Sequence, residues 1–492
     1  MITKSKHILF RLDGNAQLGT GHFSRCGALA RCGIENYGVT VSCIVRESSK
    51  DYISHFFPEE TDLYTIKDVE NEHEDAALSL AVIQDYQLAI DIIILDHYGL
   101  GETWEELIQE AGVYLFALDD CGRDHKAHVV LEILPPYSAT TEETQYLQGT
   151  EFALLSGAFV EERKKLLLSS DGSIKKVLVC FGGADPTDET VKVLSALEKY
   201  NDISVDVVVG AAYPEPNQLE KQCLQHKNWT LYINTPHIPK LMAQADIAIG
   251  AGGVMLLERM AMGLPSLVIS VADNQIAGSQ AIHEKGCIDY IGHYNTVSVE
   301  SVNQSFQKYI NNPDALRNMA QYASKTVDGE GGKRVWGYLL SIGLLAREAT
   351  QENCKQLYEW RNHHHNVKYT ESGGGFTLQA HQEWFRNILL DPKRCLLIVY
   401  DNNQELGVVR FDIQEDNSAI LSIYLVPSQH GNKRGLSVYF AAERYLKENF
   451  PFVVSVNSKM HKENTSSIKL HNLAGFTQDS SNEQWYCAYK KL

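Results

Sequence analysis

A histidine follows a glycine-rich turn near the start of the chain, where it could act as a base. Gly14, Gly19 and Gly21 mark the turn, and His22 comes directly after it. An apolar run precedes the turn and apolar residues recur at helical spacing behind it, which predicts a strand, a turn and a helix. Such a turn can present backbone N–H groups to an anion, and an imidazole at the helix N-terminus can accept a proton near neutral pH. A histidine that only caps the helix is the alternative interpretation.

Several strands expected in the first third of the chain end in polar residues. Near-continuous apolar runs alternate with amphipathic stretches, which is typical of a parallel sheet with helices on both faces. Asp96 and His97 follow one run, and Asp119 and Asp120 follow another. Because ligands bind at this carboxyl edge of open α/β sheets, the four residues are either site residues or ordinary turn and cap residues. The expected strands span 39–45, 88–95, 113–118 and 129–134.

A second α/β pattern begins after a polar segment, 169–173, that is typical of a linker. Gly182 and Gly183 follow its first strand, at a place that suits a phosphate. Gly252 and Gly253 follow a later strand and precede a helix expected over 254–262. The expected strands span 176–181, 205–209, 229–233, 246–249 and 266–271.

A glutamate lies one turn inside the helix that follows the second glycine turn. Glu258 could accept two hydrogen bonds from a ribose diol while the turn holds the phosphates, or it could be a solvent-facing helix residue. Asn274 and Gln275 follow the next strand, so they belong to the same edge of the sheet.

The order of elements changes near residue 346, after a connecting helix expected over 335–345. A helix over 357–362 and antiparallel strands precede a loop, Gly431 to Gly435, that opens a helix over 436–447. His363, His364 and His365 are consecutive, and neighbouring side chains on a helix point about 100° apart. We therefore expect a solvated loop there and no metal site. The expected strands span 396–400, 406–411, 420–425 and 452–456.

Composition limits the classes of function. The 492 residues suit two or three domains, and 44% apolar with 22% charged residues indicates a globular chain. A net charge of −18 disfavours nucleic acid as a partner, although backbone N–H groups can still hold a nucleotide. No run approaches the roughly 20 apolar residues of a membrane span, and the N-terminus lacks a signal-peptide pattern. Ten cysteines without a C-x-x-C pair indicate the reducing cytoplasm.

The opening motif resembles the nucleotide-sugar hydrolases of the pseudaminic-acid pathway. The matching residues are Arg11-x-Asp13 and Gly19-Thr20-Gly21-His22-x-x-Arg25-Cys26. The resemblance implies a UDP-2,4-diacetamido-2,4,6-trideoxy hexose as substrate. It also implies that water attacks the anomeric carbon with inversion, that His22 is the general base and that no metal is required. The segment 131–136 lacks an asparagine expected from that family.

The second α/β pattern resembles the nucleotide half of glycosyltransferases of the B architecture, including the peptidoglycan enzyme that uses UDP-N-acetylglucosamine. The resemblance implies that Gly252, Gly253 and Glu258 hold UDP and that Asn274 and Gln275 line the sugar cleft. Val254 stands where a serine or threonine usually follows the glycines, so one phosphate hydrogen bond is expected to be missing.

The last region resembles the GCN5-related N-acetyltransferases, and Trp360-Arg361-Asn362 resembles the subgroup that acts on nucleotide-linked amino sugars. The resemblance implies that acetyl-CoA is the co-substrate and that a splayed strand pair receives its pantetheine arm. Lys433 stands where this family usually has glycine. The general acid is His471, in place of the usual tyrosine, or Tyr486. The cofactor would contact Gly431, Asn432, Lys433, Arg434, Gly435 and Asn464.

We therefore expect an α/β chain with two Rossmann-like domains of glycosyltransferase-B architecture, 1–168 and 174–340, followed by an α+β acetyltransferase domain, 346–492. The expected function is sequential acetylation and hydrolysis of a UDP-linked amino sugar by a cytoplasmic monomer or weak homo-oligomer. A UDP-sugar glycosyltransferase, or a silent sugar-nucleotide binding module fused to an acetyltransferase, are the alternatives. The substrate-binding candidates are Arg11, Asp13, Gly19, Gly21, Arg25, Asp96, Gly182, Gly183, Gly252, Gly253, Glu258, Asn274, Gln275, Trp360 and Arg361.

Overall fold

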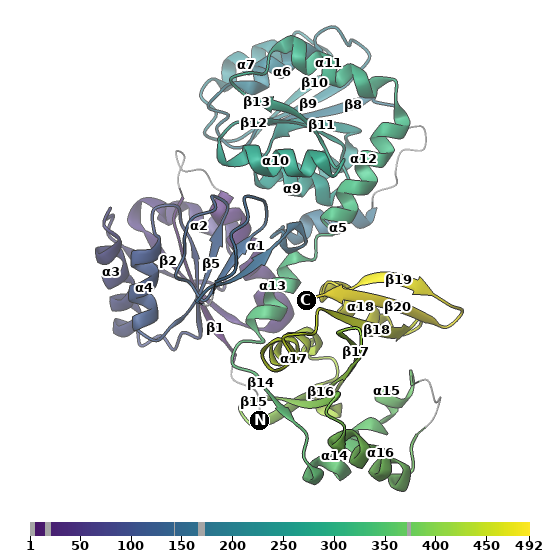
Figure 1. Cartoon of the computed structure of the whole chain (residues 1–492). Helices are drawn as coiled ribbons and strands as arrows, with labels where there is room; N and C mark the ends of the chain where they lie inside the picture. The colour runs from purple at the N-terminus through teal and green to yellow at the C-terminus, as the bar shows by residue number, and fades with distance from the viewer. Residues whose placement is uncertain (1–4, 15–20, 142, 166–172, 371–374) are drawn as a thin grey trace. The chain divides into compact units, whose positions relative to one another are not determined.

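The computed structural model describes residues 5–14, 21–141, 143–165, 173–370 and 375–492. The chain forms two compact units, residues 1–332 (unit 1) and 333–492 (unit 2). Unit 1 contains two parallel sheets, each with helices on both faces, and unit 2 contains one mixed sheet (Figure 1). Gly19 and most of the predicted linker lie outside the described residues.

The first sheet of unit 1 has the strand order β3-β2-β1-β4-β5-β6-β7 and is parallel throughout. The predicted strands are confirmed as β2, β4, β5 and β6. The edge strands β3 and β7 were not expected, because they are only partly buried and so lack an apolar run. The strands are β1 (His7–Leu12), β2 (Thr40–Arg46), β3 (Asp62–Ile66), β4 (Ile92–Asp96), β5 (Tyr114–Asp119), β6 (Val129–Glu132) and β7 (Gln145–Gln148).

Helices cover both faces of this sheet. Trp104 and Ile108 of α4 pack with Ala76 of α3 on the face that carries Leu9 and Ile93. On the other face Phe23 of α1 stacks on Phe56 of α2. The helices are α1 (Gly21–Tyr37), α2 (Lys50–Phe56), α3 (Glu72–Asp85), α4 (Glu102–Glu110) and α5 (Gly157–Lys165), with short 3₁₀ turns at Glu47–Ser49 and Thr150–Phe152.

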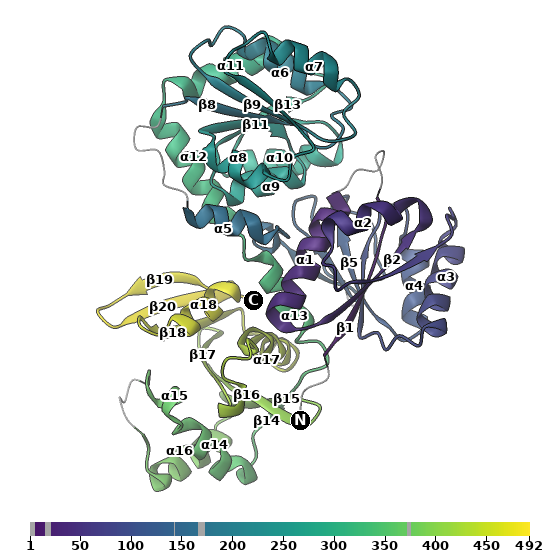
Figure 2. The same ribbon diagram turned by 180° about the vertical axis from the view of Figure 1, so that it is seen from behind.

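The second sheet of unit 1 has the order β10-β9-β8-β11-β12-β13 and is also parallel. Its strands are β8 (Lys176–Cys180), β9 (Ser204–Val209), β10 (Trp229–Ile233), β11 (Ile247–Ala251), β12 (Ser266–Ser270) and β13 (Asp289–His293). Figure 2 shows helices on both of its faces. The helices are α6 (Glu189–Leu197), α7 (Pro216–Cys223), α8 (Ile238–Gln244), α9 (Val254–Ala261), α10 (Asn274–Glu284), α11 (Val299–Ile310) and α12 (Pro313–Thr326).

In each parallel sheet the strand order reverses at one point, between β1 and β4 and between β8 and β11. Connections then leave on opposite faces and open a crevice at the carboxyl ends of the two strands. In the first sheet Asp13 directly after β1 and Asp96 at the end of β4 lie at this point. In the second sheet, Gly182 follows β8 and Gly252 follows β11. The sequence motifs therefore fall where this topology forms ligand sites.

The sheet of unit 2 has the order β14-β15-β16-β17-β18-β20-β19, and only β17 and β18 are parallel to each other. These two strands pair from Ser418 and Ser455 to Leu421 and Ser458 and not beyond. They therefore splay apart, as predicted for the acetyltransferase. The strands are β14 (Leu345–Glu348), β15 (Arg394–Asp401), β16 (Gln404–Ile413), β17 (Ser418–Leu425), β18 (Ser455–His461), β19 (Thr477–Ser481) and β20 (Trp485–Lys491).

Different helices cover the two faces of this sheet. Leu436 and Tyr439 of α17 pack on one face, and Leu357 of α14 with Phe385 of α16 packs on the other. The helix predicted over 335–345 is confirmed only over its first part, because α13 begins and ends earlier and a turn follows it before β14. The helices are α13 (Gly331–Leu339), α14 (Cys354–Arg361), α15 (His364–Val367), α16 (Leu378–Leu390), α17 (Gly435–Asn449) and α18 (Thr465–Leu473), with 3₁₀ turns at Gln351–Asn353 and Pro427–Gln429.

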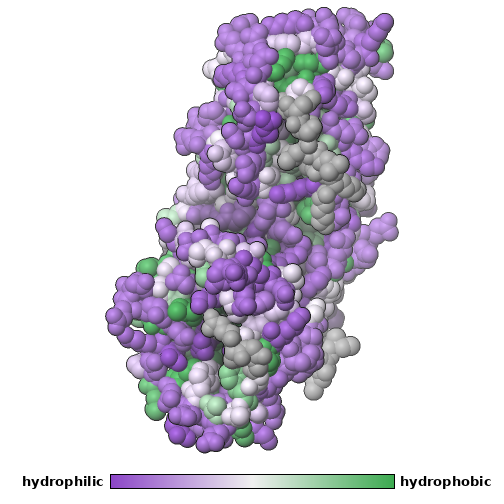
Figure 3. Space-filling model, turned by 90° about the vertical axis from the view of Figure 1, so that its right-hand side faces the viewer, coloured by the Kyte–Doolittle hydropathy of each residue, from purple (hydrophilic) through white to green (hydrophobic). Residues whose placement is uncertain are grey.

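The surface is mostly polar. Figure 3 shows hydrophilic residues over most of the face in view, with hydrophobic residues in small separate patches. Throughout the part of the chain that the structure describes, every helix is too short or too polar to cross a bilayer.

Candidate functional site

The imidazole of His22 is held by the carboxylate of Asp96. His22 Nδ1 lies 2.6 Å from Asp96 Oδ1, and both side chains are buried. Burial alone would raise the pKa of Asp96, but the charge of Arg25 and the hydrogen bonds from Arg25 and His22 lower it well below its usual range. An ionised carboxylate can only accept, so the Nδ1 proton of His22 is the donor. Nε2 of the neutral ring then carries the lone pair that a general base needs.

Arg25 and Tyr98 complete a frame around this pair. Arg25 donates from Nε and Nη2 to both Asp96 oxygens, at 2.7 and 2.6 Å, and from Nη1 to Asp120 Oδ2 at 3.1 Å. The Tyr98 hydroxyl donates to the same Asp120 oxygen at 3.0 Å. Its ring meets the His22 ring edge to face, with centroids 4.5 Å apart. The imidazole is therefore fixed by a charge on one nitrogen and an aromatic ring on its face.

A cavity of about 930 Å³ lies beside this frame. Arg25 and Tyr98, which both contact His22, line it, whereas His22 itself does not. The second sheet supplies the turn Gly252-Gly253, Val254 and Leu257 of α9, and Asn274 and Gln275 of α10. A Cβ at Gly21 would lie 3.7 Å from Val254 Cγ2, so α1 and α9 begin close together. The predicted histidine motif and the predicted nucleotide turn thus lie at one cavity.

Gln275 fixes the glycine turn on the far side of this cavity. Its Oε1 accepts from the backbone N–H of Gly252 at 3.2 Å and from that of Val271 at 3.0 Å. A Cβ at Gly252 would clash with the Ser279 hydroxyl, whereas a Cβ at Gly253 would lie 3.4 Å from Gln275 Nε2. α9 begins at this turn, and α10 begins beside it, since Gln275 in its first turn contacts Gly252; both helix N-termini favour an anion. The arrangement can hold a diphosphate.

Two predicted substrate contacts, Arg11 and Asp13, lie in the protein interior instead. Arg11 has no exposed surface and is bonded to Asp13 and to Asp75 of α3. Asp13 also accepts from the Arg46 backbone N–H at 2.7 Å, and His97 Nε2 lies 3.3 Å from it. Burial would raise the pKa of Asp13, but His97 and Arg11 lower it to about 2. This ionic network joins β1, β2 and α3.

Three other predicted residues do not line the cavity. Gly182 and Gly183 follow β8, and a Cβ at Gly210 of the neighbouring strand end would overlap the Gly183 backbone. Glu258 lies on α9 one turn after Val254 and is largely buried, and its carboxylate makes no hydrogen bond with any described residue. Burial raises the pKa of Glu258 to about 7 although the charge of Arg259 lowers it. A carboxylate without a partner remains suited to a ligand hydroxyl.

The sequence reasoning missed the apolar wall of the cavity and the role of Tyr98. The wall consists of Leu118, Leu131, Ile133, Leu134, Leu154 and Leu257. Most of these residues lie at or just beyond the carboxyl ends of β5 and β6. Because ligands bind at this edge of open α/β sheets, the same argument that selected Asp96 could have selected them. Tyr98 stands two residues after Asp96 and could have been found in the same way.

In unit 2 the loop that precedes α17 has the conformation of an anion-binding turn. Gly431 and Lys433 have φ values of 87° and 55°, and α17 begins at Gly435. The left-handed backbone at Lys433 explains why glycine is usual at this position. Arg434 is already paired, because its Nη2 lies 2.7 Å from Asp401 Oδ2. Asn464 caps α18 by accepting from the Ser467 N–H at 3.1 Å.

The geometry favours Tyr486 over His471 as the acetyltransferase acid. His471 is 2% exposed, and both ring nitrogens are in use. Nδ1 lies 2.7 Å from the Ser467 carbonyl, so it carries the proton, and Nε2 lies 2.7 Å from the Ser458 hydroxyl. Tyr486 is half-buried on β20 opposite Met460, in the part of β18 that β17 has left. It lies next to the splay that is expected to receive pantetheine.

Two clusters contain side chains of the types that bind metal ions. The carboxylates of Asp119 and Asp120 and the thiol of Cys121 lie within 4.8 Å of one another. They already face cations, since Asp119 accepts from Arg123 and Asp120 accepts from Arg25. The rings of His363, His364 and His365 lie close together at tilted angles, and His365 stacks on His430. Part of this run is the short helix α15 rather than a loop. His364 and His365 are exposed, as predicted.

Two family models match separate parts of the chain. Residues 177–331 match the glycosyltransferase family 28 C-terminal domain, and residues 344–477 match the acetyltransferase (GNAT) domain. The first match contains the Gly252-Gly253 turn and the second contains the loop before α17.

Named relatives match more than half of the chain. The chain is 24% identical over 346 residues to the spore coat polysaccharide biosynthesis protein SpsG of Bacillus subtilis, with 68% of this chain and 98% of SpsG aligned. It is 25% identical over 288 residues to the UDP-2,4-diacetamido-2,4,6-trideoxy-beta-L-altropyranose hydrolase of Campylobacter jejuni, with 57% and 97% aligned. A crystal structure of MurG from Acinetobacter baumannii aligns with a TM-score of 0.49 at 15% identity, over 67% of this chain and 98% of MurG. The chain thus combines a part that is similar to a pseudaminic-pathway hydrolase and matches the glycosyltransferase family 28 C-terminal domain with a part that matches the acetyltransferase (GNAT) domain.

Proposed function

We propose that unit 1 hydrolyses a UDP-linked 2,4-diacetamido-2,4,6-trideoxy hexose to UDP and the free sugar. His22 Nε2 takes a proton from water as the water oxygen bonds to the anomeric carbon. The bond between that carbon and the diphosphate oxygen breaks, and its electron pair leaves with UDP. Attack from the face opposite the diphosphate inverts the anomeric centre. The helix N-termini at Gly252-Gly253 and Asn274 stabilise the charge that develops on UDP.

The observation that carries this proposal is the His22–Asp96 pair beside a cavity that also contains the nucleotide turn. General-base catalysis of this kind contributes about 10²- to 10⁴-fold. Glu258 supplies an acceptor for the ribose diol. The apolar wall suits a sugar that presents a 6-methyl and acetamido methyl groups more than one covered with hydroxyls. The reaction needs no metal in this scheme, because water is activated by the imidazole.

For unit 2 we propose acetyl transfer from acetyl-CoA to the 4-amino group of a UDP-linked amino sugar. The backbone N–H groups of residues 431–435 would hold the pyrophosphate of the cofactor at the start of α17. The amine attacks the thioester carbonyl, the C–S bond breaks, and the amine proton is lost to solvent. Tyr486 donates a proton to the departing thiolate, with Trp360 and Arg361 on the acceptor side.

The two reactions follow each other, since the acetylated product of unit 2 is the substrate proposed for unit 1. Tethering raises the local concentration of that intermediate. We place the enzyme in the cytoplasm, as a monomer or weak homo-oligomer. All ten cysteines are free thiols, which suits a reducing compartment.

The test is incubation of the full chain with the UDP-linked 4-amino sugar and acetyl-CoA, followed by NMR. The expected sequence is appearance of the N-acetyl methyl signal and then loss of the anomeric signal of the nucleotide sugar. Acetylation without cleavage would leave only the unit 2 function.

A UDP-sugar glycosyltransferase remains the second candidate, because the family 28 domain match covers the nucleotide half of such enzymes. The two functions differ in their acceptor. Release of UDP in buffer without any added acceptor supports the hydrolase, and release only when a second sugar is added supports the transferase.

A further inference from the structure

Arg259 of α9 is a buried arginine beside the glycine turn of the second sheet. It is 1% exposed, and a Cβ at Gly250 would lie 2.9 Å from its Nη1. Gly250 of β11 pairs with Cys180, the last residue of β8, so the guanidinium lies where the strand order of this sheet reverses. Given the UDP site proposed for unit 1, we propose that Arg259 is a positioning residue of that site, which fixes the turn that holds the diphosphate and directs positive charge toward it.

Arg259 and Gln275 hold the two ends of one peptide group. Arg259 Nη2 donates to the carbonyl oxygen of Ala251 at 2.6 Å, and Gln275 Oε1 accepts from the N–H of Gly252 at 3.2 Å. This carbonyl and this N–H belong to the same planar peptide group and point in opposite directions. Because glycine adopts both signs of φ, the peptide would otherwise be free to rotate, and the N–H groups that follow it would change direction. The two side chains together therefore fix the orientation of the turn.

Arg259 is itself anchored to the next strand. Its Nε donates to Ser266 Oγ at 3.2 Å, and that hydroxyl donates to the Leu264 carbonyl oxygen at 2.9 Å. Ser266 is the first residue of β12. Nη1 is also buried, and it has no hydrogen-bond partner among the residues that the structure describes. The guanidinium is therefore held in one orientation with a donor still unused.

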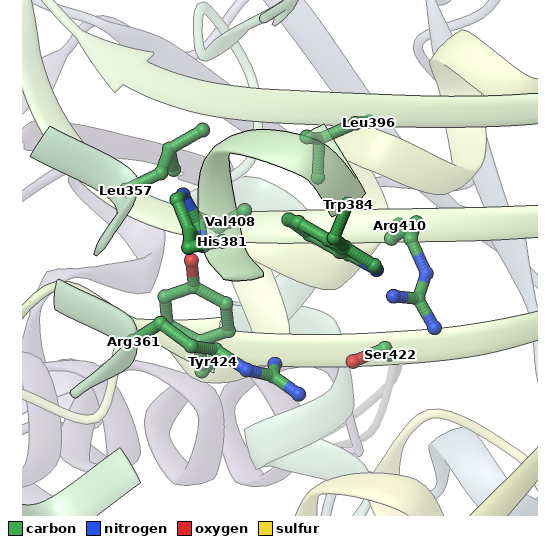
Figure 4. Close-up of a pocket in the computed structure, with 9 residues that line it drawn as sticks. All are labelled: Leu357, Arg361, His381, Trp384, Leu396, Val408, Arg410, Ser422 and Tyr424. Carbon is green, nitrogen blue, oxygen red and sulfur yellow. The ribbon is translucent and has the colours of Figure 1, made fainter. Parts of the chain in front are cut away.

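The positive charge of Arg259 lacks the partners that other arginines of this chain have. Arg25 Nη2 lies 2.6 Å from Asp96 Oδ1. Figure 4 shows the half-buried Arg361 of unit 2 beside Tyr424, and its guanidinium carbon lies 5.5 Å from the centre of that ring. Within the described part of the chain, Arg259 has no carboxylate oxygen within 4.0 Å and no aromatic ring beneath its guanidinium. Its charge is therefore available to a bound anion.

Glu258, the acid that precedes Arg259 in the sequence, neutralises this charge only in part. Burial raises the pKa of Glu258 to about 7, and burial lowers the pKa of Arg259 to about 10. At neutral pH Glu258 is therefore partly protonated, whereas Arg259 is charged. The protein interior screens such a charge less than water does, so it stabilises an anion several ångströms away. The diphosphate should gain from this field, and the uridine part of UDP should not.

The experiment measures the binding of UDP and of uridine to the full chain at pH 8, where Glu258 is mostly ionised. It compares Arg259→Gln and Arg259→Lys with the control Arg317→Gln, which removes the same charge from an exposed position on α12. Arg259→Gln should bind UDP about tenfold or more weakly and uridine within about twofold, because only UDP carries the diphosphate. Arg259→Lys should recover part of the loss, and the control should bind both ligands normally. An equal loss for UDP and uridine, or normal UDP binding in Arg259→Gln, would overturn the assignment.

A double-mutant cycle tests the shared peptide group. Gln275→Ala frees the peptide from its other end, so Arg259→Gln should cost less UDP affinity in that background than in the wild type. Losses that simply add would contradict the positioning role. Because these measurements need no turnover, they are separate from the test of the hydrolase. A UDP-selective loss in a chain that releases no free sugar would support the role of Arg259 and contradict the proposed hydrolysis. Normal UDP binding by Arg259→Gln in an active chain would do the reverse.

Discussion

His22 Nδ1 and Asp96 Oδ1 lie 2.6 Å apart, although 73 residues separate the two in the sequence. The pair forms because β1 and β4 are neighbours at the point where the strand order reverses. Asp96 also accepts two hydrogen bonds from Arg25, so it is held independently of His22. We conclude that Asp96 is placed to set the tautomer and orientation of the imidazole.

Asp96→Asn should lower kcat for UDP release by about 10²- to 10⁴-fold, with KM changed by little. An amide no longer fixes the Nδ1 proton, so the base is often in the wrong tautomer. The measurement is steady-state kinetics with a coupled UDP assay, with thermal unfolding as a check on the fold. Cys26→Ser is the matched control, because the Cys26 thiol donates to the same carboxylate and a serine hydroxyl keeps a donor there. An equal loss in the control would argue for a structural role of Asp96.

UDP affinity should increase as the pH rises through about 7. The pKa of Glu258 is raised to about 7, chiefly by burial, and a ribose diol donates better to the ionised carboxylate than to the acid. Titrations of UDP at pH 5.5 to 8.5 check this expectation. In Glu258→Gln the dependence should disappear, and an unchanged pH profile in that variant would exclude Glu258 as its cause.

Gly252→Ala should weaken UDP binding by about tenfold, whereas Gly253→Ala should have a smaller effect. The added methyl at Gly252 would clash with the Ser279 hydroxyl and displace a backbone N–H that Gln275 holds. At Gly253 the nearest atom would be 3.4 Å away. Both variants are compared by calorimetry with UDP, and the opposite ranking would show that the turn does not bind the nucleotide in this form.

His125 should stabilise unit 1 at neutral pH and lose that effect in alkaline solution. Burial would lower the pKa of His125, but Asp119 and Glu105 raise it to about 9. A folded-state pKa above the unfolded value of about 6.5 gives stability that is complete below pH 6.5 and lost as the pH rises through 9. His125→Gln should therefore lower the free energy of unfolding by about 1–3 kcal/mol at pH 6.5. In urea unfolding, the difference in the free energy of unfolding between the wild type and His125→Gln should shrink toward pH 10. A difference that does not change with pH would show that His125 is not protonated in the folded protein.

Tyr486→Phe should reduce acetyl transfer strongly, while His471→Gln should act mainly on stability. His471 is sealed between Ser458 and Ser467, and Tyr486 lies next to the splay. The acetyl-transfer rate and its pH profile are measured for both variants. If Tyr486→Phe transferred acetyl at the wild-type rate, Tyr486 would not be the general acid of the reaction.

Local patterns predicted the strands that are buried on both faces, because an apolar run and a following glycine or aspartate mark them in one stretch of sequence. Trp229–Ile233 was predicted with its exact bounds. The edge strands β3 and β19 were missed, since their side chains are largely exposed and show no such run. In open α/β sheets ligands bind at the carboxyl ends of the strands, and this rule alone selected Asp96 and Asn274 as site residues. It did so without any knowledge of which strands pair with each other.

Long-range partners could not be predicted. Arg11 was expected at the substrate, as an arginine beside a ligand motif usually is, but its partner Asp75 lies 64 residues away on α3. Burial of a charge depends on what packs against it, and that information is not local.

The most direct test is the turnover of a UDP-linked diacetamido-trideoxy sugar by His22→Ala, followed by NMR at the anomeric carbon. The account predicts that kcat falls at least about 100-fold while the dissociation constant for UDP stays the same. Turnover at the wild-type rate, with UDP still bound, would contradict the role of His22 as the base.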